Sequence, residues 1–297
     1  MDIRNVQKTG NMFYIYLPTA WCKQHDISSE SKLTLNVNND GTILLSPTMG
    51  KKKERHIELK VDEDNQSVIH KLLVACYINP ADSFQITLSK ELDYKTLLDQ
   101  KRLVAVEMVE LDGRKIICES SISIDEPSSL LKTMVNKVRN LINVILKNYN
   151  EALIERYEEE IDRSRLLIDK SVINIFTFNK TSKLKPVDIH FISNMSRSLE
   201  RFVDHLIVVD KSEKKLFMEL KEIIETLKVL LDNFEKLNYT EAIGFLKKVD
   251  KTSVAQVKSI QDYHKRRIRG HLVNVAEILM DWAITKEIES QEDNINH

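Results

Sequence analysis

The order of apolar and polar positions divides the chain into two kinds of sequence. Before residue 128, apolar residues alternate with polar ones over short stretches, as in β-strands, and four of the six Gly and four of the five Pro lie there. From Ser128 onward, apolar residues recur every three or four positions over long stretches, as in amphipathic helices. This pattern predicts a multidomain α+β protein with a small strand-rich head and a large helical body.

Residues 1–48 predict the head. Met12–Leu17 alternates as a strand and is followed by a helix of about two turns at Thr19–His25. Two further strands, through residues 33–37 and 43–45, flank the tight-turn signal Asp40-Gly41. A piece this short cannot bury its own apolar faces, so we expect two copies to pair.

Residues 55–126 predict a small α/β module in the order β-α-β-α-β-β. The expected strands are His56–Val61, 84–88, 104–111 and 115–120, and the expected helices are 67–77 and 92–103. No Gly-rich phosphate loop follows a strand, and no Ser/His/Asp arrangement is visible. We therefore expect this module to act as a spacer.

Residues 127–290 predict an all-α body. The helix-start signal Asp125–Ser128 precedes the first of six apolar stripes. The stripes span Leu131–Ile145, Ile161–Phe176, Val187–Val209, Leu216–Leu237, Tyr239–Ile260 and Ile268–Ile288. Helices of this length with short connections predict two antiparallel three-helix layers.

Composition narrows the classes of protein. The net charge of −1 over 297 residues excludes a protein that coats nucleic acid along its whole surface. Three cysteines without a CxxC pair argue against a disulfide framework or a zinc ribbon. The chain has no apolar run long enough for a membrane span and no signal segment, so we expect a cytoplasmic protein without membrane insertion.

Two acidic pairs in the body are the main candidates for chemistry. Glu200 and Asp204 are one helical turn apart, and Glu158 and Asp162 repeat this spacing on the preceding helix. If the two pairs face one another, their oxygens suit Mg²⁺, Mn²⁺ or Fe. The alternative is that they form surface ion pairs with four nearby arginines, namely Arg163, Arg165, Arg197 and Arg201.

The histidines of the body allow two interpretations each. We expect His205 to be a polar core residue or a neighbour of the acidic pairs rather than a ligand. His264 lies among Arg266, Arg267 and Arg269, a basic cluster that could bind an anion, phosphate included, or form a solvated helix face.

The head resembles the AbrB/SpoVT/MazE DNA-binding domain. The resemblance lies in the stretch Arg4–Gly10, the strand ending in Leu17-Pro18, a short helix with Trp21, and the Asp-Gly hairpin. It departs at Ile27–Glu30, where the family has a Gly-rich turn. The resemblance implies a dimer with interlaced hairpins, in which the following residues contact DNA: Arg4, Gln7, Lys8 and Asn11.

Because the head supplies few positive charges, useful DNA affinity requires a dimer or larger assembly. Arg4 and Lys8 could instead be ordinary solvated charges. The basic run Lys51–Arg55 is interpreted as a solvated linker or as an additional phosphate clamp.

The body resembles the PhoU family of phosphate-uptake regulators, through the near-signature Arg-x-Leu-Glu-Arg-x-x-Asp-His at Arg197–His205 and the Glu158/Asp162 pair. The resemblance implies two three-helix repeats whose acidic pairs hold metal. In the second repeat, Arg266 and Gly270 replace the expected acids, and Asp250 stands opposite Val254. An arginine at a ligand position repels a cation, so we expect at most one metal site, at Glu158, Asp162, Glu200 and Asp204.

Together these features predict a homodimeric, phosphate-responsive, DNA-binding transcriptional regulator that is not an enzyme. The alternative is an adaptor that contacts a phosphate transporter or a signalling kinase, with the head as a dimerisation clasp. A metal-dependent phosphohydrolase is least supported, because the body offers no obvious nucleophile.

Overall fold

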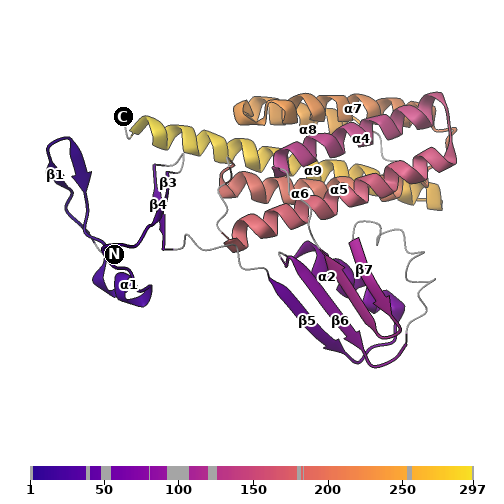
Figure 1. Ribbon diagram of the computed structural model, residues 1–297. Coiled ribbons are helices and arrows are strands. Elements are labelled where there is room, and N and C mark those ends of the chain that lie inside the picture. The colour runs from indigo at the N-terminus through magenta and orange to yellow at the C-terminus, as the bar shows by residue number, and fades with distance from the viewer. Residues whose placement is uncertain are drawn as a thin grey trace. The chain divides into compact units, whose positions relative to one another are not determined.

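The computed structural model describes residues 3–37, 41–47, 55–79, 81–91, 107–119, 126–178, 182, 184–252 and 256–295. The chain divides into two compact units, Met1–Lys53 and Glu54–His297. The first unit holds short strands and one short helix, whereas the second holds a small sheet and a set of long helices (Figure 1). The predicted α+β class is confirmed.

Two antiparallel hairpins and a short helix make up the first unit. Strand β1 (Gln7–Thr9) pairs with β2 (Met12–Tyr14) around Gly10, whose φ of 62° suits a residue without a Cβ. Helix α1 (Thr19–Gln24) follows, and β3 (Thr34–Val37) then pairs with β4 (Ile43–Ser46). The strand predicted over Met12–Leu17 ends at Tyr14, because Tyr14 pairs with Gln7, the first residue of β1.

The strands of the first unit carry large apolar side chains that face solvent. None of its described residues is buried. The exposed apolar side chains on or beside its strands include Val6, Met12, Phe13, Tyr14, Ile15, Tyr16, Leu35, Val37, Ile43 and Leu44. A single copy of this unit therefore lacks an apolar core in its described part.

The second unit begins with a four-stranded sheet in the order β5-β6-β8-β7. Its strands are β5 (His56–Val61), β6 (Ser83–Leu88), β7 (Glu107–Asp112) and β8 (Lys115–Glu119). Strand β5 runs parallel to β6, while β6–β8 and β8–β7 are antiparallel pairs. The predicted helix 92–103 and the predicted strand start at 104–106 lie outside the described residues.

Helix α2 (Gln66–Ile78) connects β5 to β6 and starts at Asn65, whose side chain accepts hydrogen bonds from the Ser67 and Val68 amides. Its buried residues pack with those of the sheet in one apolar core that also contains Leu166 of the next helix bundle. The α/β module and the bundle thus share packed side chains.

Six helices form the bundle that is coloured from magenta to yellow in Figure 1. They are α4 (Pro127–Lys147), α5 (Glu151–Phe178), α6 (Pro186–Leu206), α7 (Lys214–Asp232), α8 (Tyr239–Asp250) and α9 (Ile260–Ile295). Helix α4 starts with Pro127 at its first turn, as the sequence predicts. Helix α6 packs against α9 and α4 against α7, and one apolar core runs through all six helices.

Several helix ends differ from the sequence prediction, and three of them have an identifiable physical reason. Helix α8 ends at Asp250 rather than Ile260, and Val257 and Ile260 are exposed. Helix α9 begins at Ile260 rather than Ile268, because Ser259 and Asp262 cap its first turn. The Asp262 amide donates to Ser259 Oγ at 3.1 Å, and Ser259 Oγ donates to Asp262 Oδ2 at 2.8 Å. Helix α5 starts at Glu151 rather than Ile161, after Asn150 accepts from the Leu153 amide.

Among the described residues, no helix combines the length and apolar character that a membrane crossing requires.

Candidate functional site

Three of the four predicted metal ligands lie together on neighbouring helices. Asp162 is on α5, and Glu200 and Asp204 are one turn apart on α6, which packs against α5. Each offers a carboxylate oxygen within 4.8 Å of the other two. None of the three is buried. Glu158, one turn before Asp162 on α5, lies outside this group, which we call the carboxylate cluster.

An arginine neutralises part of the carboxylate cluster. Arg165 Nε lies 3.5 Å from Glu200 Oε1 in an ion pair, and its NH1 donates to Asp169 at 2.8 Å. Arg197 also pairs with Asp169, at 3.3 Å. The alternative prediction, that nearby arginines form ion pairs with these acids, is therefore confirmed for Glu200, whose partner is Arg165. Asp169, only 3% exposed, escaped the sequence prediction although its spacing from Arg165 is that of a helical ion pair.

The carboxylate cluster can bind a hard cation. Carboxylate oxygens coordinate Mg²⁺ at about 2.0–2.1 Å and Ca²⁺ at about 2.3–2.6 Å, so two oxygens bound to one ion lie at most about 4.2 Å apart for Mg²⁺ and about 5.2 Å apart for Ca²⁺. The oxygens of the carboxylate cluster all lie within 4.8 Å of one another, so they can share one ion with little movement. Carboxylates this close repel one another when all are ionised, and the Arg165 contact offsets some of that repulsion at Glu200. The chemistry of the donors thus fits Mg²⁺, Mn²⁺ or Fe.

A second polar cluster lies where α6 packs against α9. His205 in the last turn of α6 contacts four residues of α9, of which His264, Arg267 and His271 make the polar cluster and Tyr263 packs edge-on against its ring. Its Nδ1 is 3.0 Å from His264 Nδ1, and its Nε2 is 3.5 Å from Arg267 Nε. Arg267 NH2 is 3.3 Å from His271 Nε2. We call the three histidines and Arg267 the histidine–arginine cluster.

Arg267 fixes the direction of the hydrogen bonds in this cluster, because a guanidinium only donates. The Nε2 atoms of His205 and His271 must therefore accept, so the neutral imidazoles carry their hydrogen on Nδ1. His205 Nδ1–H then donates to His264 Nδ1. His271 Nδ1 is buried and has no hydrogen-bond partner among the described residues.

Burial and neighbouring positive charge keep two of these imidazoles neutral at pH 7. The pKa of His205 is lowered by burial and then by His264 and Arg267. Burial, Arg267, His205 and Arg201 lower the pKa of His271 from 6.5 to about 4. His271 is 3% exposed. His205 is a half-buried polar residue whose ring faces α9.

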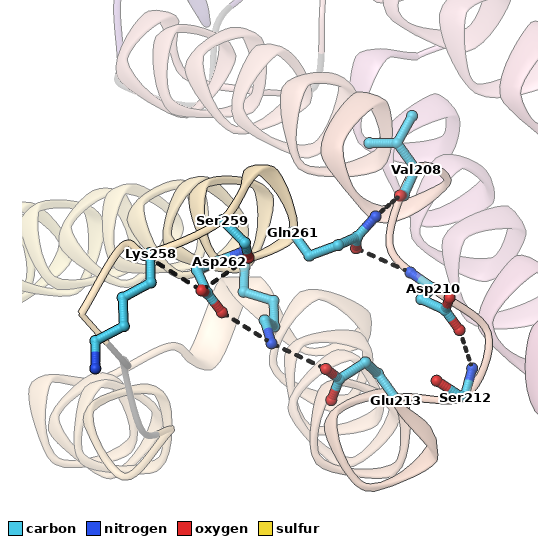
Figure 2. Close-up of polar contacts among 9 residues, drawn as sticks. Val208, Asp210, Ser212, Glu213, Lys258, Ser259, Gln261 and Asp262 are labelled. Atoms are coloured by element: carbon cyan, nitrogen blue, oxygen red, sulfur yellow. Dashed lines mark hydrogen bonds and ion pairs between the residues drawn. The ribbon is translucent and has the colours of Figure 1, made fainter.

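A polar network holds the start of α9 against the loop that follows α6. Figure 2 shows Gln261 bridging this loop, with its Nε2 donating to the Val208 carbonyl at 3.1 Å and its Oε1 accepting from the Asp210 amide at 3.0 Å. Lys265 pairs with Glu213 at 2.9 Å and with Asp262 at 3.2 Å. These contacts fix the helix ends that carry His205 and His264.

The positions predicted to match the acidic pairs in a second repeat form no such cluster in the described part of the chain. Asp250 pairs with Arg269 at 3.3 Å. Arg266 and Gly270 are exposed, and Val254 lies outside the described residues. The four residues predicted to form one basic cluster, His264, Arg266, Arg267 and Arg269, therefore do not act as a single group. Arg269 pairs with an acid, whereas His264 and Arg267 belong to the histidine–arginine cluster.

The predicted DNA contacts of the head are all exposed. Gln7 and Lys8 lie on β1, Asn11 lies in the turn before β2, and Arg4 precedes the hairpin. Lys8 Nζ lies 5.2 Å from the ring centroid of Phe13, its cross-strand partner. Of the basic run Lys51–Arg55, only Arg55 belongs to the described residues.

Two polar centres in the bundle and one exposed hairpin in the head are thus the candidate sites of this chain. Comparison with known proteins adds no relative, since no protein-family model, curated protein or solved structure matches the chain.

Proposed function

We propose that the protein is a phosphate-responsive, DNA-binding transcriptional regulator that acts as a homodimer. The observation that carries the proposal is the head, a separate unit whose exposed hairpin presents Gln7, Lys8 and Asn11 beside apolar strands that one copy leaves uncovered. Pairing of two heads would bury those strands and bring two basic hairpins together. The helical unit then supplies the centres that sense the signal.

A dimer is needed because each head offers few charges. Phosphate contacts from Arg4 and Lys8 alone give weak binding, and linking two such contacts on one duplex multiplies the affinity through effective concentration. Gln7 and Asn11 add donors and acceptors beside these charges, which suit contacts to the DNA backbone or to base edges.

In the helical unit, Asp162, Glu200 and Asp204 would hold one Mg²⁺, Mn²⁺ or Fe ion. A bound cation would neutralise the carboxylate cluster and tie α5 to α6. Since α6 also packs against α9, occupancy of this site would affect the packing of the bundle.

Fluorescence anisotropy with short DNA duplexes over a series of salt concentrations tests the proposal. Binding should weaken linearly with the logarithm of the salt concentration, and replacing Arg4 and Lys8 by Ala should reduce that slope by about two units for each head that contacts the duplex. The matched control replaces Lys23 and Lys32, two exposed lysines of the same unit outside the hairpin, and should leave the slope unchanged. A slope that drops equally in both variants would reject a specific role for the hairpin.

The second candidate is an adaptor for a phosphate transporter or a signalling kinase, with the head as a dimerisation clasp. The low number of basic side chains in the described head favours it. Absence of DNA binding at every salt concentration, together with a stable dimer, would select this function. Metal-dependent phosphate-ester hydrolysis that is abolished by Asp204→Asn would instead indicate an enzyme.

A further inference from the structure

Three parts of the helix bundle that are distant in sequence meet beside the end of α6. Lys211, in the connection from α6 to α7, places its Nζ 4.6 Å from the ring centroid of Tyr149, in the connection from α4 to α5. Gln261, at the start of α9, donates to the carbonyl of Val208 in the α6–α7 connection. We call the region of these connections the loop end. In Figure 1 it is the end of the bundle where α4 turns into α5 and where α9 begins.

Large apolar side chains of the loop end are exposed to solvent. Ile260 is 68% exposed, and the exposed fractions of Tyr149, Val208 and Tyr263 are 48%, 45% and 43%. Tyr263 lies beside the last turn of α6, since its ring contacts that of His205. None of the four exposed residues belongs to the apolar core of the bundle. Scattered exposed apolar residues are common in proteins, but a group gathered from separate segments marks a contact surface.

Lysines lie beside these apolar side chains. Lys211 is close to Val208 in the chain, and Lys258 is close to Ile260. Neither lysine has an acidic partner among the described residues. Figure 2 shows the Lys258 side chain extending away from the polar network at the start of α9. Further exposed lysines without an acidic partner in the described part of the chain end α4 or begin α7, namely Lys147, Lys214 and Lys215.

The acids of the loop end are largely occupied by partners within the protein. Glu213 and Asp262 both pair with Lys265, at 2.9 and 3.2 Å. Asp210 accepts a hydrogen bond at 2.8 Å from the backbone amide of the second residue after it. Glu151, in the first turn of α5, is exposed. The exposed charges beside the apolar side chains are therefore mainly positive.

We propose that the loop end is a docking surface for an anionic lipid membrane. The lysines attract negatively charged headgroups, while Val208, Ile260 and the two tyrosines enter the headgroup layer, where an aromatic ring with a polar tip is favoured. Gln261 and Lys265 hold these side chains in place, because they join the start of α9 to the segment after α6 (Figure 2). This contact stays at the membrane surface and requires no spanning helix.

The type of cation favours a lipid surface over a protein partner. The exposed cations described at the loop end are all lysines. Contact surfaces between proteins are depleted in lysine and enriched in arginine, whereas lysines near anionic headgroups strengthen membrane binding. The apolar side chains also come from separate connections rather than from one helix face, which suits a broad surface better than a single docked helix.

The docking surface goes beyond the proposed function and does not depend on it. The loop end belongs to the second unit, whereas the proposed DNA contacts Arg4 and Lys8 belong to the first. Membrane binding and DNA binding are therefore tested with different variants of the same protein, and failure of one leaves the other intact.

Flotation of the full-length protein with lipid vesicles tests the surface. Vesicles of phosphatidylcholine are the neutral probe, and vesicles that also contain phosphatidylglycerol are the anionic probe. We expect the protein to float with the anionic vesicles only, and added salt should weaken the binding because it screens the lysines. Lys211→Gln combined with Lys258→Gln should weaken binding about tenfold or more, since each lysine near an anionic surface strengthens it about fivefold.

A second variant tests the apolar part of the surface. Ile260→Ser should weaken binding to anionic vesicles about tenfold, because a large apolar side chain no longer leaves water on docking. The change should not affect folding, since Ile260 is largely exposed and lies outside the core. Val229→Ser is the control, because Val229 is 60% exposed near the end of α7, away from the loop end, and its replacement should leave the affinity unchanged.

Lys71→Gln combined with Lys236→Gln is the control for charge. Lys71 is exposed on α2, and Lys236 is exposed after α7, at the other end of the bundle. Equal weakening by the two double-lysine variants would overturn the docking surface. Loss of vesicle binding when Arg4 and Lys8 are replaced would also overturn it and assign the contact to the head. A protein that floats with neither kind of vesicle would reject the lipid surface and leave an acidic protein as the partner of the loop end.

Discussion

Lys170 of α5 shows how packing changes the chemistry of a single residue. It is 2% exposed, and its ammonium lies 4.1 Å from the ring centroid of Tyr77 on α2. Burial lowers the pKa of Lys170 from 10.5 to about 8. Nothing in the spacing of the sequence marks this lysine, because its burial arises from the packing of α2 on α5.

Lys170→Met should stabilise the protein near pH 7, by up to about 3 kcal/mol, because burial disfavours the ammonium more than the nearby Asp82 carboxylate favours it. The unfolded chain binds the proton more tightly than the folded chain, so wild-type stability gains from Lys170 as pH rises from about 8 to 10.5. The advantage of the variant should therefore shrink over that range. Denaturant unfolding at pH 7 and pH 10 measures both effects.

The exposed Lys147 at the end of α4 provides the control, and Lys147→Met should change stability little at either pH. An advantage of Lys170→Met that persists unchanged at pH 10 would contradict a lowered pKa.

The carboxylate cluster shows how far residue spacing can predict a site. Spacing along two helices correctly placed Asp162, Glu200 and Asp204 together, because residues four apart share a flank. It could not place Glu158 outside the group, since that depends on how α5 is positioned against α6. Nor could it reveal that Arg165 divides its contacts between Glu200 and Asp169.

If the carboxylate cluster holds a cation, protein purified without chelator should contain about one equivalent of Mg²⁺, Mn²⁺ or Fe by elemental analysis. Glu200→Gln combined with Asp204→Asn should lose the metal, because both changes remove charged ligands. Asp250→Asn, at the position that the sequence analysis matched to this pair, should retain it. If the wild-type protein is purified without metal, and if Arg165→Ala strongly destabilises it, arginine pairing alone supports the carboxylate cluster.

The interface between α6 and α9 depends on one buried acid. Asp188, 5% exposed in the first turn of α6, accepts hydrogen bonds from Trp282 Nε1 at 2.6 Å and from Lys286 Nζ at 3.1 Å. Trp282 is fully buried against Phe191 and Phe234. Apolar periodicity predicted that both helices pack inward, but not this pairing, since the two residues are far apart in the sequence.

Asp188→Ala should destabilise the protein by about 3–5 kcal/mol, because it leaves the Trp282 N–H and the Lys286 ammonium without their buried partner. Asp188→Asn should cost less, since an amide oxygen can still accept from Trp282. Asp281→Ala, an exposed acid on α9, should change stability by less than about 0.5 kcal/mol. Chemical denaturation of the three variants provides the comparison, and equal stability of Asp188→Ala and wild type would refute the assigned role.

Element boundaries illustrate what periodicity leaves open. The apolar stripes predicted the interiors of all six bundle helices, whereas caps at Asn150 and Ser259 set the starts of α5 and α9. Cap residues are single polar positions that also occur in loops, so they are hard to recognise in a sequence. An apolar stripe can also continue by chance past the end of a helix, as Val257 and Ile260 continue the stripe of α8, and the predicted helix end is then wrong.

At the scale of the whole molecule, the head should control assembly. Its apolar strands are uncovered in one copy, so burial against a second copy is the expected source of its stability. Leu35→Lys should convert a dimer into monomers in sedimentation velocity, because it places a charge in the apolar pairing surface. Val68→Lys, an exposed apolar position of the second unit, should leave the dimer intact.

A fragment of residues 1–53 that sediments as a stable folded monomer would contradict dimerisation through the head. The sequence could predict this need for a partner from length and alternation alone. The sequence cannot predict how the two chains are arranged, because the arrangement depends on contacts between the copies.

Helix α5 carries two apolar faces, and this affects where the protein can be shortened. Ile161 and Ile168 lie in the core of the bundle, whereas Leu166 belongs to the core of the sheet. A shortened protein beginning at Pro127 would leave Leu166 facing water and Lys170 without the Tyr77 ring. The lower-risk point for separating the second unit from the head is Glu54, where one cut removes no side chain from either core.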